Sequence, residues 1–123
     1  MSEALERAKA AAVKLKVFPL PSVALLPGAA LPLHIFEQRY CDMVRDALAA
    51  DRIFAMAHVV PGQEPLLEGK PELETMLCIG SIGMWDQPSD GRYNLVLIGV
   101  ARAKIIRELP SSESYRVVEA EVL

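Results

Sequence analysis

The spacing of hydrophobic positions along the chain changes from segment to segment, and one segment has a clear helical period. Between Glu37 and Ala50 the apolar residues recur at intervals of three and four, with charged residues between them. They are Tyr40, Met43, Val44, Ala47 and Leu48. We therefore expect one main helix over about residues 37–50, with Glu37 near its positive end, where the helix dipole favours a carboxylate.

Most of the remaining chain has the short apolar runs that are typical of strands. The expected strands are Val17–Leu20 and Val23–Leu26, as two brief strands or one bent strand, and then Ile53–Val60, Thr75–Trp85, Tyr93–Val100, Arg102–Leu109 and Tyr115–Leu123. A short alternating run over Leu31–Ile35 leads into the helix. Asp90-Gly91 predicts a hairpin turn, and Pro61–Glu74, with three prolines and four glutamates, predicts a surface loop. One helix among about six strands indicates an α+β, mainly β domain with a curled sheet.

The first sixteen residues have a different composition, rich in Ala, Leu, Glu and Lys. Ala4, Leu5, Ala8 and Ala12 fall at helical spacing, and Ser2 is a suitable N-cap. A stripe made mostly of alanine buries little area, so a helical or flexible arm is expected. We accordingly divide the chain into an arm, residues 1–16, and a β-rich domain, residues 17–123.

Charge and hydropathy argue against a membrane segment and against nucleic-acid binding, and indicate the cellular compartment. Twenty residues from Val17 to Phe36 carry no formal charge, but four prolines interrupt them, and a proline removes a helical hydrogen bond. We therefore expect this stretch inside the protein and not in a membrane. The net charge of −3 disfavours nucleic acid, and two cysteines without a Cys-x-x-Cys pair indicate a reducing, cytoplasmic setting.

Motifs for catalysis and for cofactor binding are missing from the sequence. Gly69-Lys70 is followed by proline and is no P-loop, and Gly80-Ser81-Ile82-Gly83 lacks the third glycine of a dinucleotide fingerprint. No serine sits in a Gly-x-Ser-x-Gly elbow, and the two histidines and two cysteines lack metal-ligand spacing. We predict no catalytic residue, no cofactor, no metal site and no enzymatic activity.

One segment is more specific than these general features. It comprises Phe18-Pro19-Leu20, Pro27-Gly28 and the run from Leu31 to Tyr40, LPLHIFEQRY. It resembles the opening signature of the LON domain, the amino-terminal substrate-binding domain of ATP-dependent Lon proteases. The similarity continues through Gly80–Gly83, Asp90-Gly91-Arg92 and the run from Gly99 to Ile105.

The resemblance implies a PUA-like pseudo-barrel and a role in recognising polypeptides. The ATPase and peptidase motifs of full-length Lon proteases are not in this sequence, so the resemblance implies no peptidase activity. The residues of the signature are expected to be structural first, with His34, Glu37 and Arg39 in a hydrogen-bonded network at the strand-to-helix corner. The signature residues are Pro27, Gly28, Pro32, His34, Phe36, Glu37, Arg39 and Tyr40.

For contact with a protein or polypeptide partner, the candidates are apolar residues that the fold leaves uncovered. Leu66 and Leu67 in the long loop and Trp85 beside the hairpin are the residues we single out. An RNA-binding role is the alternative, because PUA-like folds include RNA binders. If the last strand is an unpaired sheet edge, a homodimer by strand addition is also open.

Overall fold

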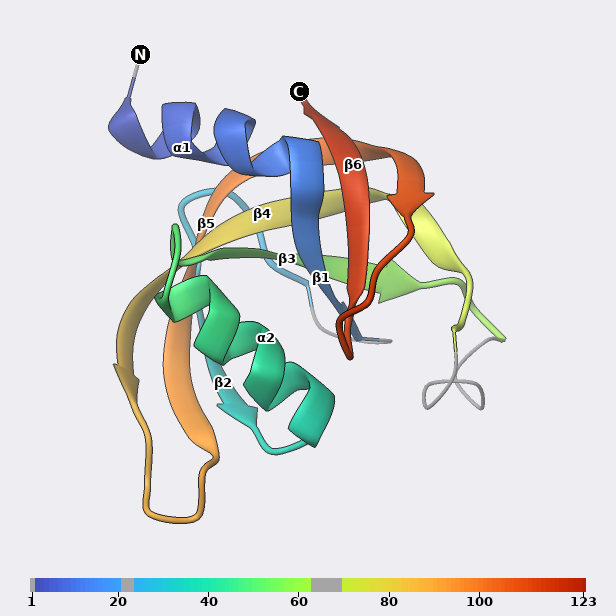
Figure 1. Ribbon diagram of the computed structural model, residues 1–123. Coiled ribbons are helices and arrows are strands. Elements are labelled where there is room, and N and C mark those ends of the chain that lie inside the picture. The colour runs from blue at the N-terminus through green and yellow to red at the C-terminus, as the bar shows by residue number, and fades with distance from the viewer. Residues whose placement is uncertain (1, 21–23, 63–69) are drawn as a thin grey trace.

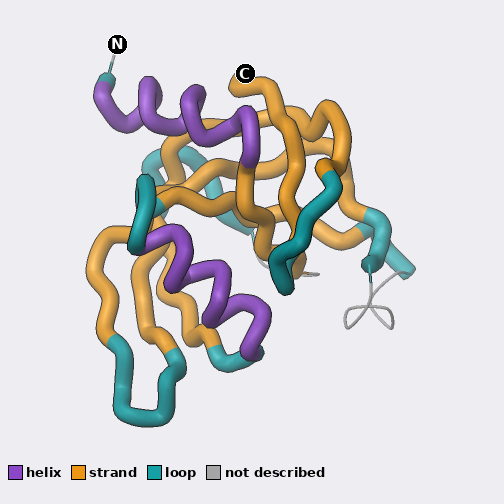
Figure 2. Tube along the Cα trace, viewed as in Figure 1, coloured by secondary structure: helices purple, strands orange, loops and turns teal. Residues whose placement is uncertain are grey.

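The computed structural model describes residues 2–20, 24–62 and 70–123 as one curled sheet flanked by helices (Figures 1 and 2). The elements in chain order are α1 (Glu3–Ala11), a 3-10 turn η1 (Ala12–Lys14), β1 (Leu15–Leu20), β2 (Ala30–Ile35), α2 (Gln38–Leu48), β3 (Ile53–Val59), β4 (Leu73–Asp86), β5 (Tyr93–Leu109) and β6 (Arg116–Val122). The predicted mainly β fold with one main helix is confirmed. Within the described part of the chain, neither α-helix is long and apolar enough to cross a membrane.

The sheet closes on itself through its last strand. The strand order is β2-β5-β4-β3-β1-β6, and β6 pairs a second time with β5, so five strands form a ring while β2 lies outside it. Leu15–Val17 pairs with one side of β6, and Ala103–Leu109 pairs with the other. The final strand is therefore paired on both sides over residues 117–118, so the condition for a dimer by strand addition, a fully unpaired last strand, is not met.

Strand β5 is longer than the sequence predicts. Two strands were expected, Tyr93–Val100 and Arg102–Leu109, but the backbone continues without a turn. Ile79 pairs with Ala101 and Gly80 with Gly99, which leaves Val100 as an extra residue in a bulge. A bulge bends a strand without ending it. The bend allows the first half of β5 to pair with β2 and the second half with β6.

The predicted strand Val23–Leu26 is not formed in its described part. Residues 24–26 have no regular structure, and Val23 lies outside the described residues. The chain instead turns at Leu26–Ala29, where the Ala29 N–H donates to the Leu26 carbonyl at 3.0 Å. Proline at the second position and Gly28 at the third, with φ +84°, match a type II turn.

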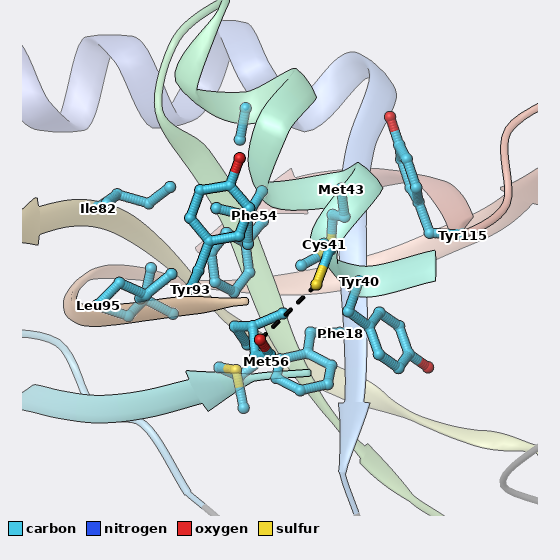
Figure 3. Close-up of a cluster of buried hydrophobic side chains, with 14 of the residues drawn as sticks. Phe18, Tyr40, Cys41, Met43, Phe54, Met56, Ile82, Tyr93, Leu95 and Tyr115 are labelled. Atoms are coloured by element: carbon cyan, nitrogen blue, oxygen red, sulfur yellow. Dashed lines mark hydrogen bonds between the residues drawn. The ribbon is translucent and has the colours of Figure 1, made fainter. Parts of the chain in front are cut away.

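Helix α2 covers one face of the sheet and encloses the larger hydrophobic cluster (Figure 3). It begins at Gln38, one residue later than expected, and Glu37 caps it through the backbone only. Tyr40, Met43, Val44 and Ala47 on the predicted helix face are all buried. The Phe18 ring lies 4.5 Å from the Tyr40 ring, centroid to centroid, which joins α2 to β1.

The predicted N-terminal arm is helical and packs against the ring. Ala8 is fully buried and Ala12 is 3% exposed in a second hydrophobic cluster, which includes Leu15 and Val17. The Arg7 guanidinium donates to the backbone carbonyl of Asp51. In Figure 1, α1 and the C-terminus lie at one end of the molecule, and the β2–α2 connection lies at the other.

Candidate functional site

A pocket opens where β1 ends, β2 ends and α2 begins. Its walls are mostly apolar, and its volume is about 170 Å³. The residues that line this corner pocket are Phe18, Pro19, Leu20, Leu33, His34, Ile35, Phe36, Glu37, Arg39 and Tyr40. Five of the eight signature residues, His34, Phe36, Glu37, Arg39 and Tyr40, thus meet in one cavity.

The rim of the corner pocket is polar but also carries an exposed aromatic ring. Phe36 is 61% exposed, and its ring stacks on that of His34 with the centroids 5.9 Å apart. The His34 Nδ1 lies 2.7 Å from the Asn94 Oδ1, and the Arg39 Nε donates to the Glu37 carboxylate at 3.1 Å. The polar network expected from the sequence thus consists of two side-chain pairs on either side of Phe36.

The titratable groups behind the rim stay protonated near neutral pH. Burial raises the pKa of the Tyr40 phenol, although the Arg39 guanidinium, 4.7 Å above the ring, opposes part of that shift. Burial also raises the pKa of the Cys41 thiol, which lies 3.7 Å from the Ile35 carbonyl. These groups suit an uncharged binding surface better than a nucleophilic centre.

A second, shallower hollow adjoins the corner pocket. It measures about 680 Å³ and lies over β2, β5 and β4, and it shares Leu33 and His34 with the pocket. Trp85 is 42% exposed there, with its ring 6.1 Å from Tyr93, and Met84 is 79% exposed. The two hollows together form what we call the apolar groove. Of the three candidate contact residues, Trp85 lies in this groove, whereas Leu66 and Leu67 lie outside the described residues.

Strand β2 forms one wall of the groove and has an unpaired edge among the described strands. The Gly99 N–H donates to the Ala29 carbonyl at 2.9 Å. Hydrogen bonds alternate along an antiparallel strand, so the backbone groups that bond to β5 are those of Leu31, Leu33 and Ile35. The backbone groups of the residues between them face the free edge of β2. One of these is Pro32, which has no N–H to donate. The edge is therefore a poor template for another strand.

In residues 2–20, 24–62 and 70–123, no three His, Cys, Asp or Glu side chains are placed to hold a metal ion. The described lining of the groove offers apolar contact and a few hydrogen-bonding groups at the rim.

The corner pocket, the exposed Phe36 and the turn at Pro27-Gly28 all lie within one matched region of the chain. The model of the ATP-dependent protease La (LON) substrate-binding domain matches residues 14–123. The chain belongs to the LON substrate-binding domain family. The matched part of that family is the substrate-binding region and not the catalytic module.

Two curated relatives carry the same region in much longer chains. Lon protease 2 of Bdellovibrio bacteriovorus is 23% identical over 111 residues, which are 88% of this chain and 13% of the relative. Lon protease 2 of Myxococcus xanthus is 26% identical over 92 residues, or 75% of this chain and 11% of the relative. This LON chain therefore spans about an eighth of the length of these proteases.

Solved structures have the same fold. A Lon N-terminal domain protein from Xanthomonas campestris superposes with a TM-score of 0.70 at 30% identity, covering 89% of this chain and 59% of that one. The N-terminal domain of a Mycobacterium avium complex Lon protease gives a TM-score of 0.67 at 16% identity, covering 89% and 54%. The LON fold is thus retained at low sequence identity.

Sequence reasoning missed the pocket walls contributed by Phe18, Leu20 and Leu33, and the exposed Met84. Apolar residues in these runs were assigned to the core, and hydrophobic period does not distinguish a closed core from an open pocket. The available signal was the crowding of prolines around them, because a proline limits strand pairing, and Pro19 lines the corner pocket while Pro32 lines the adjoining hollow.

Proposed function

We propose that this LON domain is a non-catalytic module that binds exposed apolar side chains of polypeptides in its groove. The observation that carries the proposal is the exposure of Phe36, Trp85 and Met84 around a hollow that the fold does not fill. Exposed apolar surface with a polar rim is typical of interaction sites. The family is the second support, since its model describes a substrate-binding domain.

The size of the corner pocket indicates how much of a ligand it would hold. An engineered apolar cavity of about 150 Å³ binds benzene, and the corner pocket measures about 170 Å³. One aromatic or leucine side chain would therefore fill it. The wider hollow beside Trp85 would accept neighbouring residues of the same segment.

The mode of binding follows from the proline on the free edge of β2. Strand addition draws its affinity from a continuous row of backbone hydrogen bonds. Because Pro32 interrupts the donors on that edge, we infer that a ligand is held mainly by its inserted side chain. Such binding would tolerate many sequences, provided that an apolar anchor is present.

A titration of the intrinsic fluorescence tests the proposal. Trp85 is the single tryptophan of the chain and lies in the groove, so a tryptophan-free, permanently unfolded polypeptide should change its emission on binding. Phe36→Ala should weaken binding about tenfold, as truncation of an aromatic anchor commonly does. The matched control is Ile106→Ala, since Ile106 is 51% exposed but belongs to the second half of β5. Equal effects of the two substitutions, or no binding by the unchanged protein, would refute the proposal.

A further inference from the structure

A pocket on the sheet face formed by β3 and β4 gathers sulfur and imidazole side chains. It measures about 200 Å³, and its lining includes Met56, His58, Met76 and Cys78. Met56 and Cys78 are direct partners in the antiparallel register. His58 follows Met56 by two residues and Met76 precedes Cys78 by two, so the alternation of strand side chains agrees with their common placement.

The burial of these groups is graded from the floor of the pocket to its mouth. Met56 is 2% and Cys78 5% exposed, whereas Met76 is 42% exposed. The His58 side chain is 40% exposed, and its Nδ1 lies 3.7 Å from the Glu74 carboxylate. A carboxylate beside one ring nitrogen is the usual support of a histidine that ligates a metal through the other.

We propose that this pocket binds one Cu(I) ion through the sulfur atoms of Met56, Met76 and Cys78, with His58 as a fourth donor. Thioether and thiolate ligands select soft monovalent copper over the harder divalent ions. Directly opposed strand residues have their Cβ atoms about 5 Å apart, which leaves room for two metal–sulfur bonds between them. Methionine side chains have three rotatable bonds, which would let the sulfur atoms turn toward one ion while the strands stay paired.

The charges around the pocket fit a monovalent ion. Glu74 and Arg102 also line it, and their charges cancel. Binding forms a copper–sulfur bond, breaks the S–H bond and releases one proton to solvent. The bound thiolate then balances the single charge of Cu(I).

Anaerobic titration of the whole chain with Cu(I), against a chromogenic Cu(I) chelator, tests the site. We expect one equivalent to be withdrawn from the chelator, and Zn(II) not to compete for the site. Met56→Leu with Met76→Leu should weaken binding by about tenfold or more, because both substitutions remove thioethers at nearly constant volume. Met84→Leu, which changes an exposed methionine in the groove, is the matched control and should bind copper normally.

A thermal melt separates loss of the site from loss of the fold. Cu(I) should raise the Tm of the unchanged protein and of Met84→Leu, because the fold gathers the donors and so binds the ion more tightly than the unfolded chain does. It should leave the Tm of the double variant unchanged, while that variant still unfolds cooperatively. If the double variant does not fold, the single variant Met76→Leu is tested instead, because Met76 is half exposed and its substitution should leave the fold intact. Copper that stays on the chelator, equal binding by the thioether variants, or equal binding of Zn(II) would overturn the proposal.

Discussion

Tyr115 donates its phenolic hydrogen to the Asp46 carboxylate across a distance of 2.6 Å, and thereby joins the segment before β6 to helix α2. A second bond runs in parallel, from the Ser114 hydroxyl to Asp42 at 2.7 Å. Burial and the bond to Asp46 raise the pKa of Tyr115 well above its ordinary value. This pair of bonds holds α2 in place, and the first turns of α2 carry one wall of the corner pocket.

Tyr115→Phe should lower the free energy of unfolding by about 1–2 kcal/mol. The ring still fills its buried position, but the Asp46 carboxylate loses a donor, and a hydrogen bond to a charged group contributes about that much. Chemical denaturation monitored by circular dichroism measures the change. Ser114→Ala, which removes the exposed bond, should lower the free energy of unfolding by less. An equal or larger decrease would contradict the conclusion that the Tyr115–Asp46 bond contributes more.

The ion pair between Glu108 and Arg116 should make stability depend on acid pH. Two hydrogen bonds from Arg116, at 2.6 and 3.0 Å, lower the pKa of Glu108, and Lys70 at 3.7 Å adds to the effect. The pKa of Glu108 is therefore lower in the folded state than in the unfolded state, where it is about 4.3. The resulting stabilisation is complete above that unfolded-state pKa and is lost as the pH falls through the folded-state pKa.

Glu108→Gln should therefore lower the free energy of unfolding by about 1 kcal/mol at neutral pH, a value that allows for the partial exposure of the pair. The variant should also lose less stability than the unchanged protein when the pH falls below about 4.3. Denaturation curves at a series of pH values show both effects. Glu121→Gln, on the exposed side of β6, serves as the control and should leave the profile almost unchanged. A Glu108→Gln profile parallel to that of the unchanged protein would contradict the link.

Gly99 should not tolerate a side chain. A Cβ atom on Gly99 would overlap the carbonyl oxygen of Leu26, because the turn at Pro27-Gly28 packs directly on β5 and the Gly28 N–H donates to the Gly99 carbonyl at 2.8 Å. Gly99→Ala should lower the free energy of unfolding by about 2–3 kcal/mol, because the backbone near Leu26 would have to shift to make room for the methyl group. Gly83→Ala, where a Cβ would meet side-chain and backbone atoms at an ordinary 3.5 Å, should be nearly neutral. Thermal unfolding of both variants makes the comparison.

Binding by side-chain insertion should survive loss of the ligand's backbone donors. A peptide with one aromatic anchor and N-methyl groups on alternate residues should keep its affinity for the groove within about threefold, because a row of main-chain bonds is not the source of that affinity. Replacing the aromatic anchor by alanine in the same peptide should abolish measurable binding. If N-methylation removes binding while the alanine peptide still binds, the groove works by strand addition.

The hydrophobic period and the turn residues predict those elements of the fold that depend mainly on neighbouring residues in the sequence. The period of Tyr40, Met43 and Val44 located α2, and Asp90-Gly91 located a hairpin turn in which Gly91 has φ +85°. The continuity of β5 could not be predicted in this way. The residues near Val100 look like a break in the sequence, but a bulge keeps β5 paired with β4 through this point.

The candidate site was predictable only in part, since it is formed by contacts between distant segments. The signature run contains Phe36 and Tyr40, but Phe18 and Trp85 join them only once β1 and β4 are in position. Sequence also gave no means of deciding that Phe36 lies outside the core. That depends on where α2 begins, and α2 begins at Gln38 because Glu37 is still extended.

The placement of both chain ends away from the β2–α2 connection gives the domain a direction. In Figure 1 both chain ends lie at the opposite end of the molecule from the β2–α2 connection, and the corner pocket is lined by residues of that connection. If the groove binds polypeptides as we propose, an immobilised domain should capture them whichever end is tethered. Arrays of such domains, held side by side by their ends, would present a row of identical hydrophobic anchoring points to one long unfolded chain.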